Sequence, residues 1–243
     1  MNEKNVNDFR ISLVIPAYNE EKYIADCLKS VFSSSANFFE IIVVDNNSND
    51  RTREIASSFE GVKVFLEERA GVMNARKRGV DESKGDIIAF IDADTKMING
   101  WYEKIVDKFS DPKVVTLSGP YIYENISFLN KTLIFFYWYF LAIPSYYLLG
   151  YMAIFGNFAI RRSVLEKMGG LDTDILFYGD DTDTVRRAHK FGKTIFSMDF
   201  KIVTSPRRFV GDGIIFTAFK YMINFIYIIL FNKPFTKDQT INR

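Results

Sequence analysis

The chain has 243 residues, of which 25% are charged, and a formal net charge of +1. This balance provides no basic field of the kind that attracts nucleic acid, so we expect no nucleic-acid partner. The single cysteine, Cys27, excludes an internal disulfide. Residues 1–10 are polar and contain no apolar run with a cleavage site, so the working part is predicted to face the cytoplasm.

Short apolar runs alternate with charged helical patterns from residue 11 to about residue 120. The predicted elements are a strand at 11–15, a helix at 20–33, a strand at 40–44, a helix at 50–59, a strand at 62–66, a helix at 71–82 and a strand at 86–91. This alternation predicts an α/β fold with a Rossmann-like, mostly parallel sheet flanked by helices. In such sheets, ligands bind beyond the carboxyl ends of the strands.

Carboxylates follow three of these strands, at the edge where a ligand is expected. Glu20 follows the first strand, Asp45 ends the second, and Asp92 and Asp94 follow the fourth. In an extended chain, residues two apart point the same way, so this D-x-D pair presents two carboxylates together. Mg²⁺ or Mn²⁺ suits such a pair, with substrate phosphates as further ligands. A solvated turn is the structural alternative, and a helix cap is the expected role of Asp50.

Arginines are the next candidates for a nucleotide site. Neither G-x-x-x-x-G-K-[ST] nor a G-x-G-x-x-G after the first strand occurs in the sequence. A nucleotide is therefore expected to be held by carboxylates, a metal and arginines, for which Arg69, Arg76 and Arg78 near the helix at 71–82 are candidates. An ordinary solvated position is the alternative for Arg76.

A second acidic group begins a predicted helix late in the chain. Asp180, Asp181 and Asp183 follow Gly179, and Gly192 ends the helix. The helix dipole stabilises carboxylates at this position, which is the structural explanation. Adjacent carboxylates in a partly enclosed site also raise one pKa, which suits a general base near neutral pH. These residues alone leave both interpretations open.

Six segments resemble the successive motifs of the family 2 glycosyltransferases, in order and at similar spacing. They are SLVIPAYNEE, VVDNNSNDRT, G-x-x-x-A-R-x-x-G at Gly71–Gly79, GDIIAFIDAD, GNFAIRRSVLEKMGGLD and GDDTDTVRRAHKFG. The resemblance covers about residues 11–208. It implies a GT-A fold and the inverting transfer of a sugar from a nucleotide diphosphate donor, a UDP- or GDP-sugar, with Mg²⁺ or Mn²⁺ as cofactor.

The resemblance, together with the polar start and the apolar end of the sequence, implies a division of the chain. The expected parts are a polar N-terminal tail (1–10), a catalytic domain (11–208) with a nucleotide-binding half (11–120) and an acceptor half (121–208) that contains an aromatic insertion (126–152), and an apolar, membrane-associated C-terminal helix and tail (209–243).

Residue by residue, the resemblance implies a donor site. Its members are Pro16, Ala17, Tyr18, Glu20, Asp45, Arg76, Asp92, Ala93 and Asp94. Within this set, Asp45 is expected to bind the base, Asp92 to contact the ribose side, and Asp94 to hold the metal.

The resemblance assigns Asp181 as the catalytic base. On the acceptor side it implies Gly156, Asn157, Asp180 and Asp183. The Q-x-x-R-W motif of processive members is absent, and Arg207 and Arg208 occupy the corresponding region. Two roles are open for these arginines: closing over the diphosphate, or touching lipid headgroups.

The aromatic insertion lies within a long uncharged stretch that continues into the GNFAI segment. Both its ends must return to the catalytic domain, and Pro144 and Gly150 are expected to break it into two pieces too short to span a membrane. Trp138 and the tyrosines are typical of helices whose rings lie at headgroup level. We therefore predict a dip into the cytoplasmic leaflet, with buried core or a dimer contact as the alternative.

A second apolar run extends from Ile214 to Phe231. Its polar residues Thr217, Lys220 and Asn224 lie on one helical stripe, and basic residues flank the run. This pattern predicts an interfacial helix on an anionic leaflet, with a C-terminal membrane span as the alternative.

Together these features predict a metal-dependent, inverting glycosyltransferase at the cytoplasmic face of the cell membrane. Its acceptor is expected to be a hydroxyl of a lipid-linked molecule, in cell-envelope glycan or glycolipid synthesis. The enzyme alternative is transfer to polyprenyl or dolichyl phosphate. The non-enzyme alternative is a membrane scaffold that binds nucleotide sugars.

Overall fold

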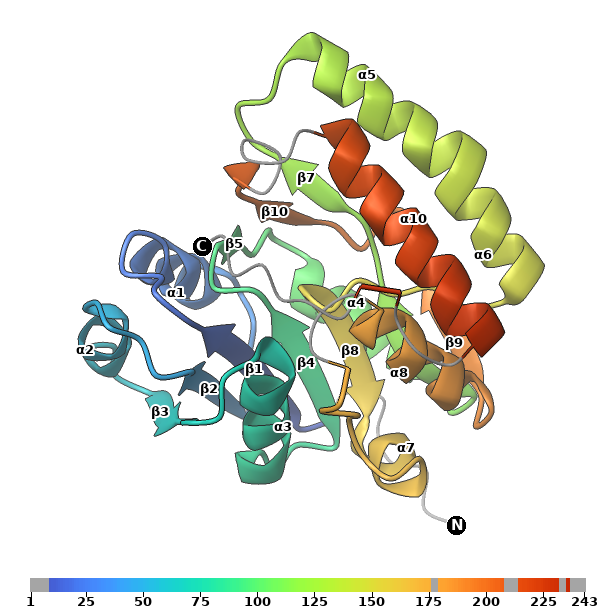
Figure 1. Ribbon diagram of the computed structural model, residues 1–243. Coiled ribbons are helices and arrows are strands. Elements are labelled where there is room, and N and C mark those ends of the chain that lie inside the picture. Colours follow the sequence, from blue (N-terminus) through green and yellow to red (C-terminus); the bar gives the residue numbers. More distant parts are fainter. Residues whose placement is uncertain (1–8, 176–178, 208–213, 232–234, 237–243) are drawn as a thin grey trace.

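Seven strands form the central sheet of the computed structural model, which describes residues 9–175, 179–207, 214–231 and 235–236 (Figure 1). The strand order is β3-β2-β1-β4-β8-β6-β9, and every neighbouring pair is parallel except the two that involve β8. The strands are β1 (Ile11–Ala17), β2 (Glu40–Asp45), β3 (Val62–Leu66), β4 (Ile87–Ile91), β6 (Val114–Ser118), β8 (Asn157–Arg161) and β9 (Lys193–Phe196). The predicted mostly parallel sheet is therefore confirmed.

Helices cover both faces of this sheet. They are α1 (Ile24–Ser33), α2 (Thr52–Ser57), α3 (Val72–Glu82), α4 (Trp101–Phe109), α7 (Arg162–Lys167) and α8 (Asp180–His189). Side chains alternate along β1: Leu13 and Ile15 belong to the core that includes α1 and α4, whereas Val14 belongs to the core with α3 and α8. Because both faces are covered, the strands can be apolar throughout, as the sequence indicates.

Two predicted helices begin later than expected because polar groups before them form turns. α1 begins at Ile24 rather than near residue 20, and α2 at Thr52 rather than near residue 50. The Asp50 carboxylate accepts hydrogen bonds from the backbone N–H groups of Thr52 (2.9 Å) and Glu21 (3.1 Å). The cap residue of α2 is Arg51, which has no side-chain cap hydrogen bond, so the prediction that Asp50 caps the helix is off by one residue. Asp50 instead accepts from the first N–H of α2 and ties the helix to the loop after β1.

A small second sheet brings the segment before Arg207 back to the D-x-D segment. Its strands are β5 (Thr95–Lys96), β10 (Ile202–Thr204) and β7 (Tyr121–Tyr123), in that order. Thr204 pairs with Thr95 in an antiparallel register. Since Arg207 follows β10 and Asp94 precedes β5, this pairing places the two residues near each other.

The aromatic insertion forms one continuous helix, so the prediction of two short pieces is wrong. It runs over 22 residues through α5 (Phe128–Phe136), the π-helical segment η1 (Tyr137–Ala142) and α6 (Ile143–Leu149). Pro144 lacks an N–H, and in a regular α-helix its ring collides with the carbonyl four residues earlier. The wider turns of η1 directly before it accommodate the ring without ending the helix. Among the described helices, this is the one whose length and composition would allow it to cross a membrane.

One side of this helix packs on β9, and the rest is exposed. Trp138 is 9% exposed and stacks on Phe196 with ring centroids 5.3 Å apart, and the Tyr146 hydroxyl donates to the carbonyl of Thr194 (3.2 Å). Trp138 therefore belongs to the protein interior, and its predicted place at headgroup level is wrong. The outward side, which we call the aromatic face, consists of Phe128, Leu129, Phe135, Phe136, Tyr139, Phe140, Tyr147 and Leu148.

Helix α10 (Ile214–Phe231) turns a polar residue inward and apolar residues outward. Asn224 is 1% exposed, and its amide donates to the carbonyl of Lys220 (2.8 Å) and the hydroxyl of Thr236 (2.9 Å). Ile228 is fully buried against Gly179, where an added Cβ would lie 2.5 Å from its Cγ1. Large apolar side chains are exposed on the other side, at Phe219, Ile226, Leu230 and Phe231. Of the predicted polar stripe, Asn224 therefore points into the protein. In Figure 1, α10 lies at the same end of the molecule as α5 and α6.

Candidate active site

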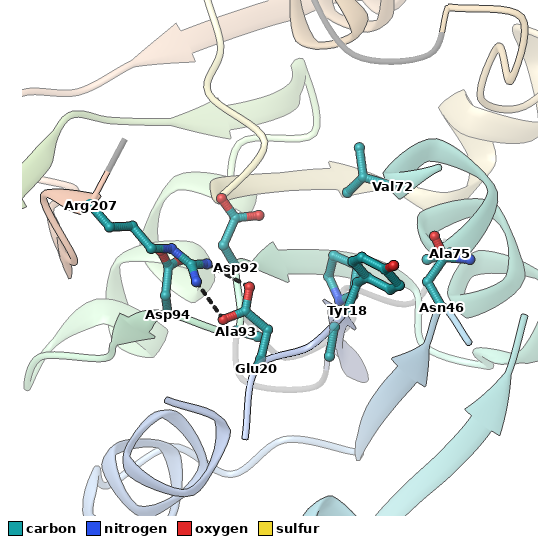
Figure 2. A pocket seen from close by; sticks show the side chains of 11 residues that line it. Tyr18, Glu20, Asn46, Val72, Ala75, Asp92, Ala93, Asp94 and Arg207 are labelled. Atoms are coloured by element: carbon teal, nitrogen blue, oxygen red, sulfur yellow. Dashed lines mark hydrogen bonds and ion pairs between the residues drawn. The ribbon is translucent and has the colours of Figure 1, made fainter. Parts of the chain in front are cut away.

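A pocket opens at the carboxyl ends of β1, β2 and β4, where the parallel sheet predicts a ligand (Figure 2). From the set predicted to bind the nucleotide sugar, it is lined by Pro16, Ala17, Tyr18, Glu20, Asp92, Ala93 and Asp94. The lining is completed by Asn46, Val72, Ala75 and Arg207. The fold thus gathers most of the predicted donor-site residues, from separate segments, around one opening.

Asp45 and Arg76 were predicted for the donor site but are not among the lining residues. Asp45 is 2% exposed, and its carboxylate accepts a hydrogen bond from the backbone N–H of Ser48 at 3.3 Å. Its neighbour Asn46 lines the pocket, and the amide oxygen of Asn46 accepts from the N–H of Gly71 (2.9 Å) at the start of α3. The sequence reasoning missed Asn46, although its place directly after a strand was a usable signal. The base contact of Asp45 stays a prediction.

The D-x-D pair lies in a turn rather than in an extended chain. Thr95 donates its backbone N–H (3.1 Å) and its hydroxyl (2.6 Å) to the carbonyl of Asp92, which closes a turn after β4. The expectation that the strand pleat aligns the two carboxylates is therefore wrong, but both Asp92 and Asp94 still line the pocket. The hydroxyl of Tyr121 donates to the Asp92 carboxylate (3.2 Å), a contact with no signal in the local sequence.

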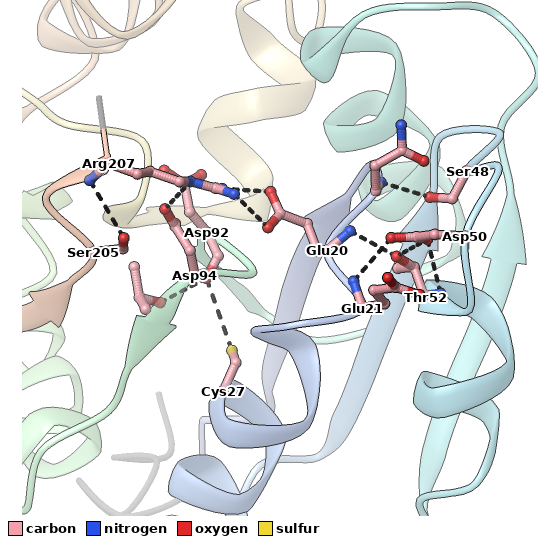
Figure 3. Close-up of polar contacts among 12 residues, drawn as sticks. Glu20, Glu21, Cys27, Ser48, Asp50, Thr52, Asp92, Asp94, Ser205 and Arg207 are labelled. Atoms are coloured by element: carbon pink, nitrogen blue, oxygen red, sulfur yellow. Dashed lines mark hydrogen bonds and ion pairs between the residues drawn. The ribbon is translucent and has the colours of Figure 1, made fainter. Parts of the chain in front are cut away.

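Arg207 lies across the pocket between Glu20 and Asp94 (Figure 3). Its guanidinium donates to both carboxylate oxygens of Glu20, at 2.8 and 2.5 Å, and its Nε lies 2.9 Å from Asp94. The guanidinium carbon is also 4.9 Å from the ring centroid of Tyr23. Arg207 therefore lies at the pocket, paired with two of its acids, and its contact with a diphosphate stays a prediction. Arg208 lies outside the described residues.

The surroundings of Asp94 fit its predicted role as the metal ligand. Its side chain is 3% exposed and pairs with a cationic group, Arg207. Within the described ranges, no three His, Cys, Asp or Glu side chains form a metal-binding group. A Mg²⁺-type ion needs only one or two protein carboxylates when phosphates complete its coordination. A site with Asp94 as its protein ligand therefore fits a metal whose remaining ligands come from a diphosphate.

Arg76 joins the donor pocket to the start of α8. It is 4% exposed, and its guanidinium donates to Asp180 (2.7 Å) and to Asp92 (3.1 Å) while lying 4.4 Å from the ring centroid of Phe155. The solvated alternative for Arg76 is therefore wrong. Arg76 is thus one cation shared by two largely buried carboxylates, and it links the turn after β4 to the start of α8.

Asp180 is buried and Asp181 is half-buried at the first turn of α8. Burial raises the pKa of Asp180 to about 7; the nearby Arg76 opposes this rise and the Asp181 carboxylate adds to it. Burial also raises the pKa of Asp181, against a hydrogen bond from the N–H of Thr182 (2.7 Å). Because the pKa of each carboxyl is raised, this pair holds a proton more readily than exposed carboxylates do. A raised pKa suits a group that must accept a proton near neutral pH.

Replacing Asp180 by asparagine should flatten the pH dependence of stability. With a folded pKa of about 7 against about 3.8 in the unfolded chain, the stabilising proton of Asp180 is fully present below about pH 4 and is lost as the pH rises through 7. Between pH 5 and pH 8, we expect the wild type to lose on the order of 2 kcal/mol more of its free energy of unfolding than Asp180→Asn. Urea unfolding in metal-free buffer measures this. Asp174→Asn, which changes an exposed carboxylate nearby, is the control, and equal slopes in wild type and Asp180→Asn would contradict the assignment.

Two residues predicted on the acceptor side lie next to each other in different environments. Gly156 lies against the D-x-D turn, where an added Cβ would be 2.4 Å from a carboxylate oxygen of Asp92. The side chain of Asn157 is fully buried; it accepts from the indole N–H of Trp101 (2.8 Å) and donates to the carbonyl of Phe200 (2.6 Å). Gly156 therefore lies directly beside Asp92 without lining the pocket, whereas the side chain of Asn157 supports the core. Contacts of both residues with the acceptor stay predictions.

Asp183 is the third acidic residue of α8, and its contacts lie within its own helix. Its carboxylate pairs with Arg186 (2.9 Å) and Arg187 (2.7 Å), and Arg187 in turn donates to the carbonyl of Gly170 (2.8 Å). These contacts hold α8 against the loop after α7. A contact between Asp183 and the acceptor stays a prediction.

Known proteins resemble the chain over most of this structure. The family model described as Glycosyl transferase family 2 matches residues 12–169. Probable glycosyltransferase YdaM of Bacillus subtilis is 32% identical over 202 residues, which are 75% of this chain and 47% of the relative. Glycosyltransferase AglE of Haloferax volcanii is 36% identical over 116 residues, which are 45% of this chain and 38% of the relative. The matches thus span less than half the length of these relatives.

Solved structures share the fold. Mannosyltransferase PcManGT from Pyrobaculum calidifontis, in complex with GDP-Man and Mn²⁺, has a TM-score of 0.60 at 22% identity and matches 80% of this chain and 56% of its own. Glucosyl-3-phosphoglycerate synthase from Mycobacterium tuberculosis has a TM-score of 0.60 at 19% identity and matches 93% of this chain and 81% of its own. The family model covers well over half of the chain, and the neighbours have the predicted GT-A fold. The chain therefore belongs to the glycosyl transferase family 2.

Proposed function

We propose that the protein is an inverting glycosyltransferase that moves a sugar from a nucleotide diphosphate donor to a hydroxyl of a lipid-linked acceptor. The observation that carries the proposal is the link through Arg76, which joins Asp92 at the donor pocket to Asp180 beside the candidate base Asp181. A donor in this pocket has its diphosphate near the D-x-D turn, so its sugar is directed toward the start of α8. Inverting transfer needs the leaving nucleotide diphosphate on one side of the anomeric carbon, and the base with the acceptor hydroxyl on the other.

The residues of the chain divide the chemistry between them. The acceptor hydroxyl oxygen attacks the anomeric carbon of the donor sugar, and the bond from that carbon to the nucleotide diphosphate breaks. A carboxylate oxygen of Asp181 takes the proton of the hydroxyl as this happens. Asp94 is the residue that would hold Mg²⁺ or Mn²⁺, and such an ion neutralises the charge that develops on the departing diphosphate. Arg76 keeps the two acidic segments at a fixed separation.

Two relatives by fold support this choice of donor and metal. The structure of PcManGT is titled as a complex with GDP-Man and Mn²⁺, and that of the synthase from Mycobacterium tuberculosis as a complex with Mn²⁺, UDP and glucosyl-3-phosphoglycerate. A GDP- or UDP-sugar with a divalent ion is therefore the donor we propose for this chain.

The exposed apolar surfaces support a lipid-linked acceptor and a place on the cytoplasmic face of the cell membrane. The aromatic face leaves Phe128 86% and Leu148 85% exposed, at the two ends of its helix, and α10 adds further outward apolar side chains. Large apolar side chains gathered on the exposed side of a helix are typical of an interaction site. A helix whose inner side packs on β9 and whose outer side is aromatic suits an interfacial position better than water.

Thermal unfolding with nucleotides tests the donor site directly. UDP or GDP, each with MnCl₂, should raise the melting temperature of the wild type, because a ligand that binds only the folded state stabilises it. The variant Asp94→Ala should lose the part of this stabilisation that requires Mn²⁺. Hydrolysis of a GDP- or UDP-sugar by the wild type but not by Asp94→Ala would exclude the scaffold alternative. Stabilisation by neither nucleotide, with or without metal, would contradict the proposed function.

A further inference from the structure

We infer that Arg207 occupies the position of the metal ion in the donor-free protein and is displaced from Asp94 when the metal arrives together with the nucleotide. The inference rests on the proposed function and goes beyond it, because it assigns a binding order and names the residue that imposes it. Arg207 would thereby make tight metal binding conditional on the nucleotide.

The contacts of Arg207 are those of a cation held in an acidic site. Its guanidinium engages both oxygens of Glu20 and, through Nε, a carboxylate oxygen of Asp94, and both carboxylates are only 3% exposed as side chains. Figure 3 shows the guanidinium between the two acids. Charge-assisted pairs of this kind are among the stronger hydrogen bonds in proteins. A divalent ion on the same oxygen of Asp94 cannot be accommodated while Nε remains 2.9 Å away.

The backbone just before Arg207 is anchored to the D-x-D segment, so movement of the side chain is sufficient for the exchange. The N–H of Ser205 donates to the carbonyl of Asp94 (3.3 Å), and Thr204 pairs with Thr95 across the small sheet. Arg207 therefore remains beside the pocket after its guanidinium leaves Asp94. The long arginine side chain has enough rotatable bonds to exchange the Asp94 carboxylate for a phosphate oxygen, which is an equally good partner for a guanidinium.

Charge balance explains why the affinity for Mn²⁺ should differ between the nucleotide-free protein and the protein with a nucleoside diphosphate. A bare Mn²⁺ must break the Arg207 contact with Asp94 and leaves the guanidinium with a new cation nearby. A complex of Mn²⁺ with a nucleoside diphosphate brings its own negative charge, so the released guanidinium gains phosphate oxygens in exchange. Nucleotide-free protein should therefore bind the metal weakly, and the nucleotide should strengthen metal binding strongly.

Mn²⁺ titration followed by electron paramagnetic resonance tests this without any measurement of transfer. In the absence of nucleotide, Arg207→Gln should bind MnCl₂ about tenfold more tightly than the wild type, because no tethered cation competes for Asp94. In the presence of UDP or GDP, this advantage should vanish or reverse, because the variant lacks the arginine that contacts the diphosphate. Arg10→Gln, which removes the same charge from a surface pair with Asp86, is the matched control and should resemble the wild type.

Arg207→Lys is the second variant, since Arg207→Gln leaves Glu20 and Asp94 without their partner and could lower the stability of the fold. Lysine keeps the positive charge but cannot contact two carboxylates through a planar guanidinium. Without nucleotide, the Mn²⁺ affinity of Arg207→Lys should therefore lie between those of the wild type and Arg207→Gln. Equal or weaker Mn²⁺ binding in both variants overturns the inference. Failure of the wild type to bind Mn²⁺ even with UDP or GDP overturns the proposed function instead, so the two failures are distinguishable.

Discussion

Replacement of Asp181 by asparagine is expected to lower sugar transfer by at least about a thousandfold. Asparagine has nearly the same shape, and its side-chain oxygen can keep the hydrogen bond from the N–H of Thr182 (2.7 Å), so the start of α8 should be retained. The amide, however, cannot accept the proton of the acceptor hydroxyl. The measurement is kcat at saturating donor and acceptor, with nucleotide binding followed by thermal unfolding. Nucleotide binding should stay within about twofold of the wild type, because Asp181 is not among the residues that line the donor pocket.

The same variant separates the two acceptor chemistries. A polyprenyl phosphate is already an anion and needs no base, so transfer retained in Asp181→Asn would contradict the hydroxyl acceptor and favour the phosphate. Asp174→Asn is the control for an exposed acid close in sequence, and it should transfer at the rate of the wild type. Loss of nucleotide binding together with transfer in Asp181→Asn would instead indicate that Asp181 supports the fold.

The local sequence pattern was sufficient to predict the central sheet and most of the residues that line the pocket. The alternation of apolar runs with helical patterns depends on burial of each strand between two layers of helices, and that burial is a property of each short segment. Residues at the carboxyl ends of parallel strands then meet by geometry, which is why Tyr18, Glu20 and Asp94 were predicted to lie together and do line one pocket.

Contacts between segments far apart in the chain could not be predicted from the sequence. Glu20 and Arg207 are separated by 187 positions, and Arg76 and Asp180 by 104, so neither ion pair has a local signature. Arg76 was predicted as a nucleotide contact, with a solvated residue as the alternative. Its position between two acids depends on how α3, the start of α8 and the turn after β4 come together in the fold. The shape of the aromatic insertion was missed for another reason. Pro144 usually ends a helix, and a π-helical segment that lets the helix continue has no established sequence pattern.

A triple substitution of Phe135, Phe136 and Phe140 by serine is expected to weaken binding to vesicles that contain anionic lipid by at least about a hundredfold. The three side chains are between 51 and 70% exposed, and even 1 kcal/mol of lost insertion energy for each would sum to about this factor. The ring contacts of these three residues are with one another and with Tyr139 on the same helix, and none of the three belongs to a core cluster. The melting temperature and the stabilisation by UDP or GDP with Mn²⁺ should therefore change little. Vesicle co-sedimentation and thermal unfolding measure the two effects separately.

Trp138→Ser is the matched control from the inner side of the same helix. Trp138 stacks on Phe196 and is 9% exposed, so its loss should cost about 3 kcal/mol or more of unfolding free energy, as large-to-small changes in a core do. The two variants should therefore show opposite results: the outer one loses membrane binding and keeps its stability, and the inner one loses stability. If the outer variant also unfolds, the aromatic face is covered by protein, as in the core or dimer alternative. If it keeps both its stability and its vesicle binding, the membrane contact lies elsewhere, and the outward apolar side of α10 is then the surface to substitute.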